Sequence, residues 1–183
     1  PIWFVNMGPS VLSKRETEEL CALSRQIFDS LPHDHPDRIP GETGVQGVMR
    51  LPQQHPRIAQ LINRIVTDAS VKAVLLSVLG PNYKIWQINL RRSGPGDKGL
   101  YLHQDAHGET GLCVLLSENR KGSGATVFLP GSHREPSRMK KWKVELPPII
   151  LMNLRFLFAP LTGTAGDIAF FFNRTWHGRF SNQ

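Results

Sequence analysis

Hydrophobic residues recur at helical spacing in two stretches of the first 80 residues. In the first stretch the apolar positions are Leu20, Leu23, Ile27 and Leu31. Just before them, Ser13 and Glu16 have the spacing of a capping box, in which a serine and a glutamate satisfy the first backbone amides of a helix. We therefore predict an amphipathic helix that begins after Ser13 and serves as scaffold.

The second stretch opens near Pro56. Its apolar stripe consists of Ile58, Leu61, Ile62, Ile65 and Val66. The pattern continues through Val78 and stops at Gly80-Pro81, which is a good helix terminator. Between the two helices, the segment from Pro32 to Gly47 is rich in proline, glycine and charge, so it predicts a long loop of the kind that often forms a lid.

After Gly80 the pattern changes to short apolar runs separated by turn residues. The predicted strands are Tyr83–Arg91, Leu100–His107, Gly111–Ser117, Ala125–Leu129, Leu154–Phe158 and Ile168–Phe172. Helices followed by closely spaced strands favour a mainly β (α+β) fold, a sandwich or barrel with helices packed outside. We expect one domain over residues 1–183, with helical support in 1–80 and the β core in 81–183.

Composition narrows the class of protein. With 183 residues, 40% hydrophobic and 20% charged, the chain is typical of one soluble globular domain. There is no apolar run of roughly 18 residues, no signal-peptide pattern and no internal repeat. Cys21 and Cys113 lie in apolar surroundings and favour reduced core thiols. These features predict an intracellular, cytoplasmic protein.

The net charge of +7 is compatible with nucleic acid, an anionic membrane surface or an acidic substrate. The densest basic stretch, Arg138–Lys143, is short and is followed by Pro147-Pro148, which favours a solvated loop face. We therefore predict no nucleic-acid partner and no membrane span, and the oligomeric state stays open.

The triplet His103-Gln104-Asp105 is the strongest chemical signal. In a strand His103 and Asp105 lie on the same face, so an imidazole nitrogen and a carboxylate oxygen can bind one metal ion. A facial triad needs a second histidine from another strand, and His177 is the best candidate because a strand and a turn precede it. His133, at the end of the turn Pro130–His133, is a rival for that third position.

Other motifs compete less well. His107 comes from the same segment as His103, so it could not easily complete a compact face of ligands. His33 and His35 flank an aspartate in a proline-rich loop, which favours a solvated surface. Residues Gly94–Gly99 match the letters of a dinucleotide fingerprint, but they lead into a predicted strand rather than a helix, so we predict a loop.

From about Tyr83 onward the chain resembles the phytanoyl-CoA dioxygenase family of iron(II)/2-oxoglutarate oxygenases. The stretches that carry the resemblance are His103–Asp105, Gly122–His133 and Gly166–Gly178. The resemblance implies a double-stranded β-helix (a jelly roll, as in cupins) with His103, Asp105 and His177 as catalytic iron ligands. It also implies that His133 belongs to a structural turn.

The implied cofactors are Fe(II) and 2-oxoglutarate, with dioxygen and a small organic or lipid-like molecule as substrates to be hydroxylated. Acyl-CoA esters, lipids, amino acids and natural-product intermediates all fit the family, so the substrate stays open. A peroxisomal location also stays open, because its signal would lie beyond Gln183. Whether the chain is a fragment is open too.

Family members anchor 2-oxoglutarate with an arginine at a position that would lie beyond Gln183. Within the chain, Arg179 shares a strand face with His177 and is the candidate for pairing with a carboxylate. Gln87 and Asn89 share a face of their predicted strand and are further candidates for cosubstrate or substrate contact. The leading alternative function is a cupin-like metal-binding protein without oxygenase activity. A nucleic-acid module and a purely structural jelly roll rank behind it.

Overall fold

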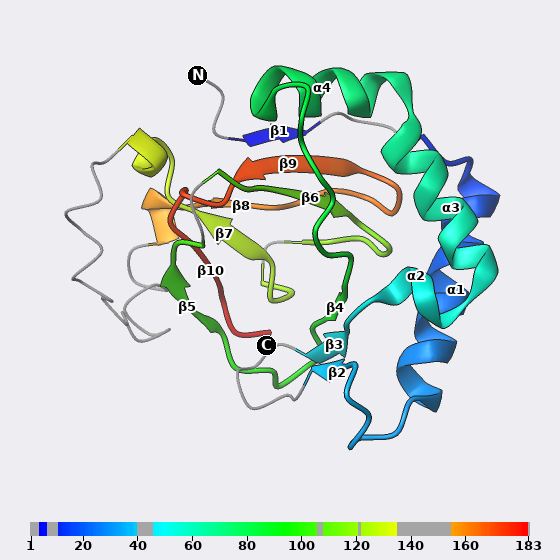
Figure 1. Cartoon of the computed structure of the whole chain (residues 1–183). Coiled ribbons are helices and arrows are strands. Elements are labelled where there is room, and N and C mark those ends of the chain that lie inside the picture. The colour runs from blue at the N-terminus through cyan, green and yellow to red at the C-terminus, as the bar shows by residue number, and fades with distance from the viewer. Residues whose placement is uncertain are drawn as a thin grey trace.

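Helices line one side of the molecule and short antiparallel strands form the other, as the computed structural model shows (Figure 1). The structure describes residues 4–6, 11–39, 46–105, 108–120, 122–134 and 155–182. The basic stretch Arg138–Lys143 and His107 lie outside the described residues. Among those that are described, no helix is both long and apolar enough to cross a membrane.

Helix α1 (Lys14–Ser30) begins where the capping box predicts. The Ser13 hydroxyl accepts from the backbone amide of Glu16 at 3.3 Å, and the Glu16 carboxylate accepts from the amide of Ser13 at 3.0 Å. These two bonds satisfy amides that have no partner inside the helix. The buried face includes Leu20 and Phe28.

The second helical region is divided, contrary to the prediction of one continuous helix. α3 (Pro56–Thr67) ends before Asp68, and α4 (Ala69–Leu79) starts after it. The Asp68 carboxylate accepts from the amides of Ser70 and Val71, so it caps α4 and turns the chain. α4 ends at Gly80, as predicted, with φ of 79°. A short helix α2 (Leu51–Gln54) was not predicted.

The predicted long loop contains two short strands, β2 (Arg38–Ile39) and β3 (Gln46–Val48), so the prediction was wrong there. They pair with β4 (Leu90–Arg92) in an antiparallel sheet of order β2-β3-β4. A Cβ on Gly47 would lie 2.1 Å from the Leu90 carbonyl oxygen, so glycine is required for this close approach. Residues 83–89, predicted as strand, have no regular structure.

Two further antiparallel sheets make up the β side. The first has the order β1-β9-β6, and the second has the order β5-β10-β7-β8. Their strands are β1 (Phe4–Asn6), β9 (Ile168–Phe172), β6 (Thr110–Val114), β5 (Leu100–His103), β10 (His177–Arg179), β7 (Thr126–Phe128) and β8 (Ala159–Pro160). β9 has the predicted bounds. Residues Arg155–Leu157, predicted as strand, form a 3-10 helix instead.

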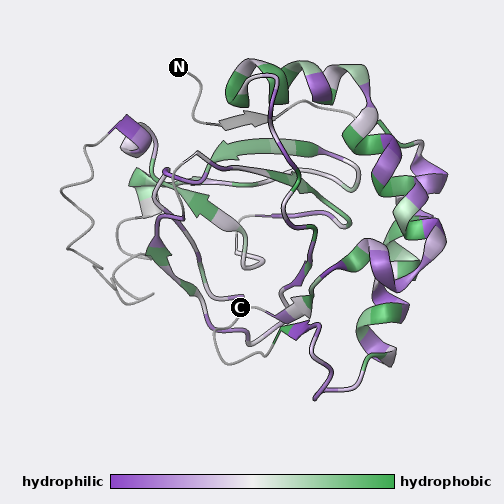
Figure 2. Cartoon of the chain, in the orientation of Figure 1, coloured by the Kyte–Doolittle hydropathy of each residue, from purple (hydrophilic) through white to green (hydrophobic). Residues whose placement is uncertain are grey.

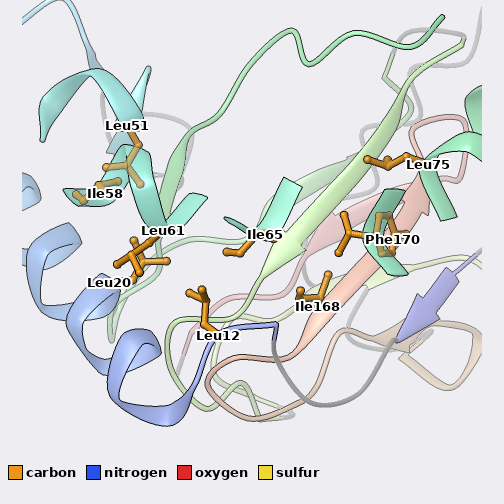
Figure 3. Packing of buried hydrophobic residues seen from close by; sticks show 10 residues of the cluster. Leu12, Leu20, Leu51, Ile58, Leu61, Ile65, Leu75, Ile168 and Phe170 are labelled. Carbon is orange, nitrogen blue, oxygen red and sulfur yellow. The ribbon is translucent and has the colours of Figure 1, made fainter. Parts of the chain in front are cut away.

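Strand β9 lies between two apolar layers because its side chains alternate. Ile168 and Phe170 face the helices and join a cluster with Ile58, Leu61 and Ile65 (Figure 3). Ala169 and Phe171 face the second sheet, where the Phe171 ring lies 4.9 Å from that of Phe128 on β7. Burying a side chain such as Leu61, which is fully buried, contributes about 1.5–3 kcal/mol.

Hydropathy follows the same layering. β9 is hydrophobic along its length, and the outward surfaces of α1 and α3 carry the hydrophilic residues (Figure 2).

The N-terminal part of the chain is more than a helical support, because it also contributes β1 to the first sheet and β2 and β3 to the third. The molecule is a mixed α and β structure in which two antiparallel sheets meet beside a helical layer (Figure 1).

Candidate metal centre

His103 and His177 lie directly opposite each other on neighbouring strands. They are register partners in the antiparallel pair of β5 and β10, and their ring centroids are 4.3 Å apart. Gly178 permits this pairing, because a Cβ there would lie 2.8 Å from the carbonyl oxygen of Leu100. Two strands that approach this closely bring two imidazoles from distant parts of the sequence to one point.

Asp105 completes the group just beyond the end of β5. One carboxylate oxygen lies 3.4 Å from Nε2 of His177, and the other lies 3.7 Å from Nε2 of His103. A ligand atom from each of the three residues lies within 4.8 Å of the others, so the group could hold a metal ion. The backbone amide of Asp105 donates to the carbonyl of Asn173 at 2.9 Å, which fixes the carboxylate relative to β10.

Each histidine is oriented by its other ring nitrogen. Nδ1 of His177 lies 2.8 Å from the carbonyl oxygen of Thr175, and Nδ1 of His103 lies 2.8 Å from that of Tyr101. Because a carbonyl can only accept, both Nδ1 atoms carry the proton and donate it. Nε2 of each ring is then directed toward Asp105, as in histidines that bind metals.

The electrostatics of the group favour a bound cation. Burial and the neighbouring His177 lower the pKa of His103, so its imidazole is neutral at neutral pH. Hydrogen bonding with His177 lowers the pKa of Asp105, with further contributions from His103 and Arg91, so this side chain is a carboxylate. Metal ions bind histidine and carboxylate side chains in these proton-free forms.

The group is enclosed on one side and open on the other. The side chain of His177 is 8% exposed, whereas those of His103 and Asp105 are 36% and 46% exposed. The rings of Phe171 and Phe128 lie 5.3 and 6.1 Å from that of His177 and form the closed wall. A small molecule can therefore approach from the side of Asp105.

Arg91 on β4 is a residue that the sequence analysis missed. Its positive charge acts on Asp105, and burial lowers the pKa of its guanidinium. Leu90 packs against the helical cluster, so Arg91, its neighbour in β4, lies on the opposite face of that strand. In the sequence, polar residues recur at every second position in Gln87, Asn89 and Arg91, and this pattern could have indicated Arg91.

The three predicted cosubstrate contacts have different surroundings. Arg179 on β10 is only 7% exposed, donates to the Lys98 carbonyl at 3.1 Å and lies 4.0 Å from the Asp97 carboxylate. Its Nε has no hydrogen-bond partner among the described residues. The amide oxygen of Asn89 is buried and likewise unpartnered within the described ranges, while Gln87 is exposed.

The competing histidines lie elsewhere in the structure. His133 stacks on Phe172 at 5.8 Å, burial lowers its pKa, and it does not belong to the group formed by His103, Asp105 and His177. Nδ1 of His35 accepts from the backbone amide of Asp37, so this ring stabilises its own loop. Residues Gly94–Gly99 form a loop that leads into β5, and the Asp97 carboxylate accepts from the amide of Gly94 at 2.7 Å.

Two antiparallel sheets meet around two histidines and a carboxylate, a group that could hold one metal ion and would leave some of its coordination positions open. The family model described as phytanoyl-CoA dioxygenase (PhyH) matches residues 10–183. The chain belongs to this family. The match confirms the resemblance drawn from the three motifs, and it also includes the N-terminal helices.

Among curated proteins, the chain is similar to the ectoine dioxygenase of Bordetella parapertussis, with 26% identity over 172 residues. That match covers 78% of this chain and 54% of the relative. The ectoine dioxygenase of Stutzerimonas stutzeri is 24% identical over 151 residues, with 67% of this chain and 50% of the relative covered. The chain thus spans about half the length of the curated relatives it matches.

Solved structures show the same fold. EctD from S. alaskensis with bound Fe superposes with a TM-score of 0.73 at 20% identity, over 98% of this chain and 67% of that one. HygX from Streptomyces hygroscopicus, with nickel and 2-oxoglutarate bound, gives a TM-score of 0.67 at 18% identity, over 97% and 76% of the two chains. The antiparallel architecture with its helical layer is therefore that of EctD and HygX.

Proposed function

We propose that this chain is the catalytic part of an Fe(II)/2-oxoglutarate-dependent dioxygenase that hydroxylates a small organic molecule. The observation that carries the proposal is the convergence of His103, Asp105 and His177 from β5 and β10. Family membership and neighbours that contain Fe, or nickel and 2-oxoglutarate, support it. We also propose that the two facing sheets form a double-stranded β-helix and that residues 1–183 belong to one domain.

In this proposal the chain supplies three ligands on one face of the ion: Nε2 of His103, a carboxylate oxygen of Asp105 and Nε2 of His177. The carbonyls of Tyr101 and Thr175 hold the two rings in the orientation that presents Nε2. When bound, the ferrous ion and 2-oxoglutarate would supply the activation of dioxygen and the oxidation of a substrate C–H bond. Phe128 and Phe171 exclude water from the His177 side.

The cosubstrate is a dianion, and the structure offers two arginines for its carboxylates. Arg179 is buried, with one nitrogen unpartnered among the described residues, and Arg91 acts on Asp105 from β4. We propose that both guanidinium groups, together with the unpartnered amide oxygen of Asn89, form the polar lining of the site. Gln87, which is exposed, would lie at its entrance.

The substrate class follows from similarity alone. The curated relatives are named ectoine dioxygenases, and one HygX structure contains hygromycin B, so polar small molecules are the substrates to test first. A lipid-like substrate stays within the proposal, as do a cytoplasmic location and the absence of a nucleic-acid partner.

One observation favours a second candidate, a metal-binding protein without oxygenase activity. Arg179 already has the Lys98 carbonyl and the Asp97 carboxylate as neighbours, so it is less available to a cosubstrate than a free arginine would be. In that case iron would bind to the triad and 2-oxoglutarate would not.

The first test is an anaerobic titration with iron(II) and then 2-oxoglutarate, followed by the weak visible charge-transfer band of the ternary complex. We expect the band in the wild type and in His133→Ala, and its loss in His177→Ala. His133→Ala is the matched control, since it removes a partly buried histidine outside the triad. Iron binding without a band would favour the second candidate, and no iron binding at all would rule out both.

Arg91→Gln and Arg179→Gln separate the two proposed carboxylate partners. Each substitution removes the charge and leaves a shorter polar side chain in place of the guanidinium. We expect each to weaken 2-oxoglutarate binding roughly 10-fold or more while leaving iron affinity in place. Unchanged 2-oxoglutarate affinity in either variant would remove that arginine from the site.

A further inference from the structure

The turn Asn173–Trp176 connects β9 to β10 and leads directly into His177. The segment that carries Asp105 is bound to this turn at two points. The backbone amide of Asp105 donates to the Asn173 carbonyl at 2.9 Å, and the side-chain amide of Gln104 donates to the Arg174 carbonyl. The position of the carboxylate therefore depends on the position of the turn.

A second segment holds the same turn from another side. The Ser132 hydroxyl accepts from the backbone amide of Trp176 at 2.9 Å and donates to the carbonyl of Leu129 at 2.7 Å. The amide of Leu129 in turn donates to the carbonyl of Trp176 at 2.8 Å. Ser132 is 6% exposed, so water does not readily replace its hydroxyl.

The turn also orients the second histidine. The carbonyl of Thr175 accepts from Nδ1 of His177, and the amide of Thr175 donates to the carbonyl of Phe172 at 2.8 Å. One short segment thus sets the ring angle of His177 and the place of Asp105. Displacement of this segment would change the distance between these two ligands.

We propose that Gln104 and Ser132 are positioning residues that act through the Asn173–Trp176 turn to hold Asp105 and His177 in one geometry. The proposal rests on the proposed function in so far as the triad binds a divalent ion. Gln104 lies between two ligands in the sequence, yet its side chain binds the turn. Ser132 belongs to the Pro130–His133 motif, and it is this serine, rather than His133, that links the motif to the site.

The test measures cobalt(II) affinity by anaerobic competition with a coloured chelator, for the wild type, Gln104→Met, Ser132→Ala and the double variant. Methionine keeps the length of glutamine and removes its donor. Outer hydrogen-bond partners of ligands typically change metal affinity 10–100-fold, so we expect a loss of about that size in each single variant. The visible cobalt spectrum should change as well, because the geometry of the ligands changes.

Two control variants remove equivalent hydrogen bonds elsewhere. Ser123→Ala is matched to Ser132→Ala, since the Ser123 hydroxyl also accepts from a backbone amide and donates to a carbonyl, both of Arg120. Gln54→Met is matched to Gln104→Met, since the Gln54 amide donates to Asp37 at 2.8 Å in the helical part. Both controls should bind cobalt like the wild type.

The outcomes distinguish this proposal from the proposed function. If the wild type does not bind cobalt, the proposed metal site fails. If the wild type binds and both single variants bind equally well, the positioning role is wrong. Because both residues act through one turn, the double variant should lose less affinity than the two single losses combined. Fully additive losses would mean that Gln104 and Ser132 do not act through the same turn. Thermal unfolding without metal checks that each variant is folded.

Discussion

The helical side and the two-sheet side of the molecule differ in the side chains that they bury. The helices pack against β9 through one large apolar cluster, and α1 and α4 begin with side chains that satisfy their first amides. The two sheets bury smaller apolar clusters together with His177, Arg179 and Thr175. The helical side also buries Thr17, Ser24 and Asp37, but the largest apolar cluster lies there, whereas the sheets bury a histidine and an arginine of the candidate site. Substitutions on the helical side should therefore change the free energy of unfolding, and substitutions in the two sheets should change metal affinity.

The largest effect is expected from Gly178→Ala in β10. The added Cβ would lie 2.8 Å from the carbonyl oxygen of Leu100 and 3.2 Å from that of Tyr101, so β5 and β10 must move apart. We expect cobalt(II) affinity to fall at least about 100-fold, measured by chelator competition. Gly94→Ala is the control, since its Cβ would meet open space. Unchanged affinity in Gly178→Ala would mean that the close strand pair does not set the site.

The next largest effect is expected from Leu61→Ala on the helical side. Leu61 is fully buried, and removing a side chain of this size from a core costs about 2–5 kcal/mol of unfolding free energy. Chemical denaturation would measure the loss, and cobalt affinity measured well below the unfolding temperature should stay at the wild-type value. Leu76→Ala, at an exposed position of α4, should change little. A loss of metal affinity in Leu61→Ala would contradict the division between the two sides.

A smaller effect is expected at the start of α1. Ser13→Ala removes the hydroxyl that accepts from the amide of Glu16, which should cost about 0.5–2 kcal/mol of unfolding free energy. Among the described residues, the hydroxyl of Ser77 bonds to a carbonyl within its own helix, so Ser77→Ala serves as the control. Equal unfolding free energies for both variants in urea would mean that the capping box adds nothing here.

The smallest effect is expected at Asp37 and depends on pH. Hydrogen bonds from Arg50 and then Gln54 lower the pKa of this carboxyl below its ordinary value of 3.8. A carboxyl with a lowered pKa in the folded state stabilises the fold above its ordinary pKa, and this contribution is lost as the pH falls through the folded value. Asp37→Asn should therefore be less stable than the wild type at neutral pH, and the difference should shrink in acid below pH 3.8. A difference that is constant with pH would contradict the ion pair.

The sequence predicted correctly those features that depend on residues close together in the chain. The capping box located the start of α1, the apolar run located β9, and the spacing of His103 and Asp105 indicated a metal-binding face. The assignment of these two residues and His177 as iron ligands, with Arg179, Gln87 and Asn89 near the cosubstrate, stays a prediction until metal and cosubstrate binding are measured.

Two of the failed predictions have long-range causes, and one, the break at Asp68, has a local cause. β2 and β3 form because Gly47 lets the chain approach Leu90, which is distant in the sequence. The break between α3 and α4 arises because Asp68 caps a new helix where apolar spacing alone suggested continuation. Arg91 was missed because its charge acts on Asp105, which follows a strand of another sheet. The contacts of Gly47 and Arg91 exist only once the chain is folded, so periodicity does not reveal them.

The uneven exposure of the triad has a consequence for the purified protein. An ion held by His103, Asp105 and His177 would keep its carboxylate side in contact with solvent, so it could exchange with ions in the medium. Nitrogen and oxygen ligands of this kind bind nickel and copper more tightly than ferrous iron. The identity of the metal bound after purification would then depend on which metals were available during growth and handling. On the proposed function, protein produced in iron-poor medium and exposed to nickel should be inactive until the nickel is removed and ferrous iron is added.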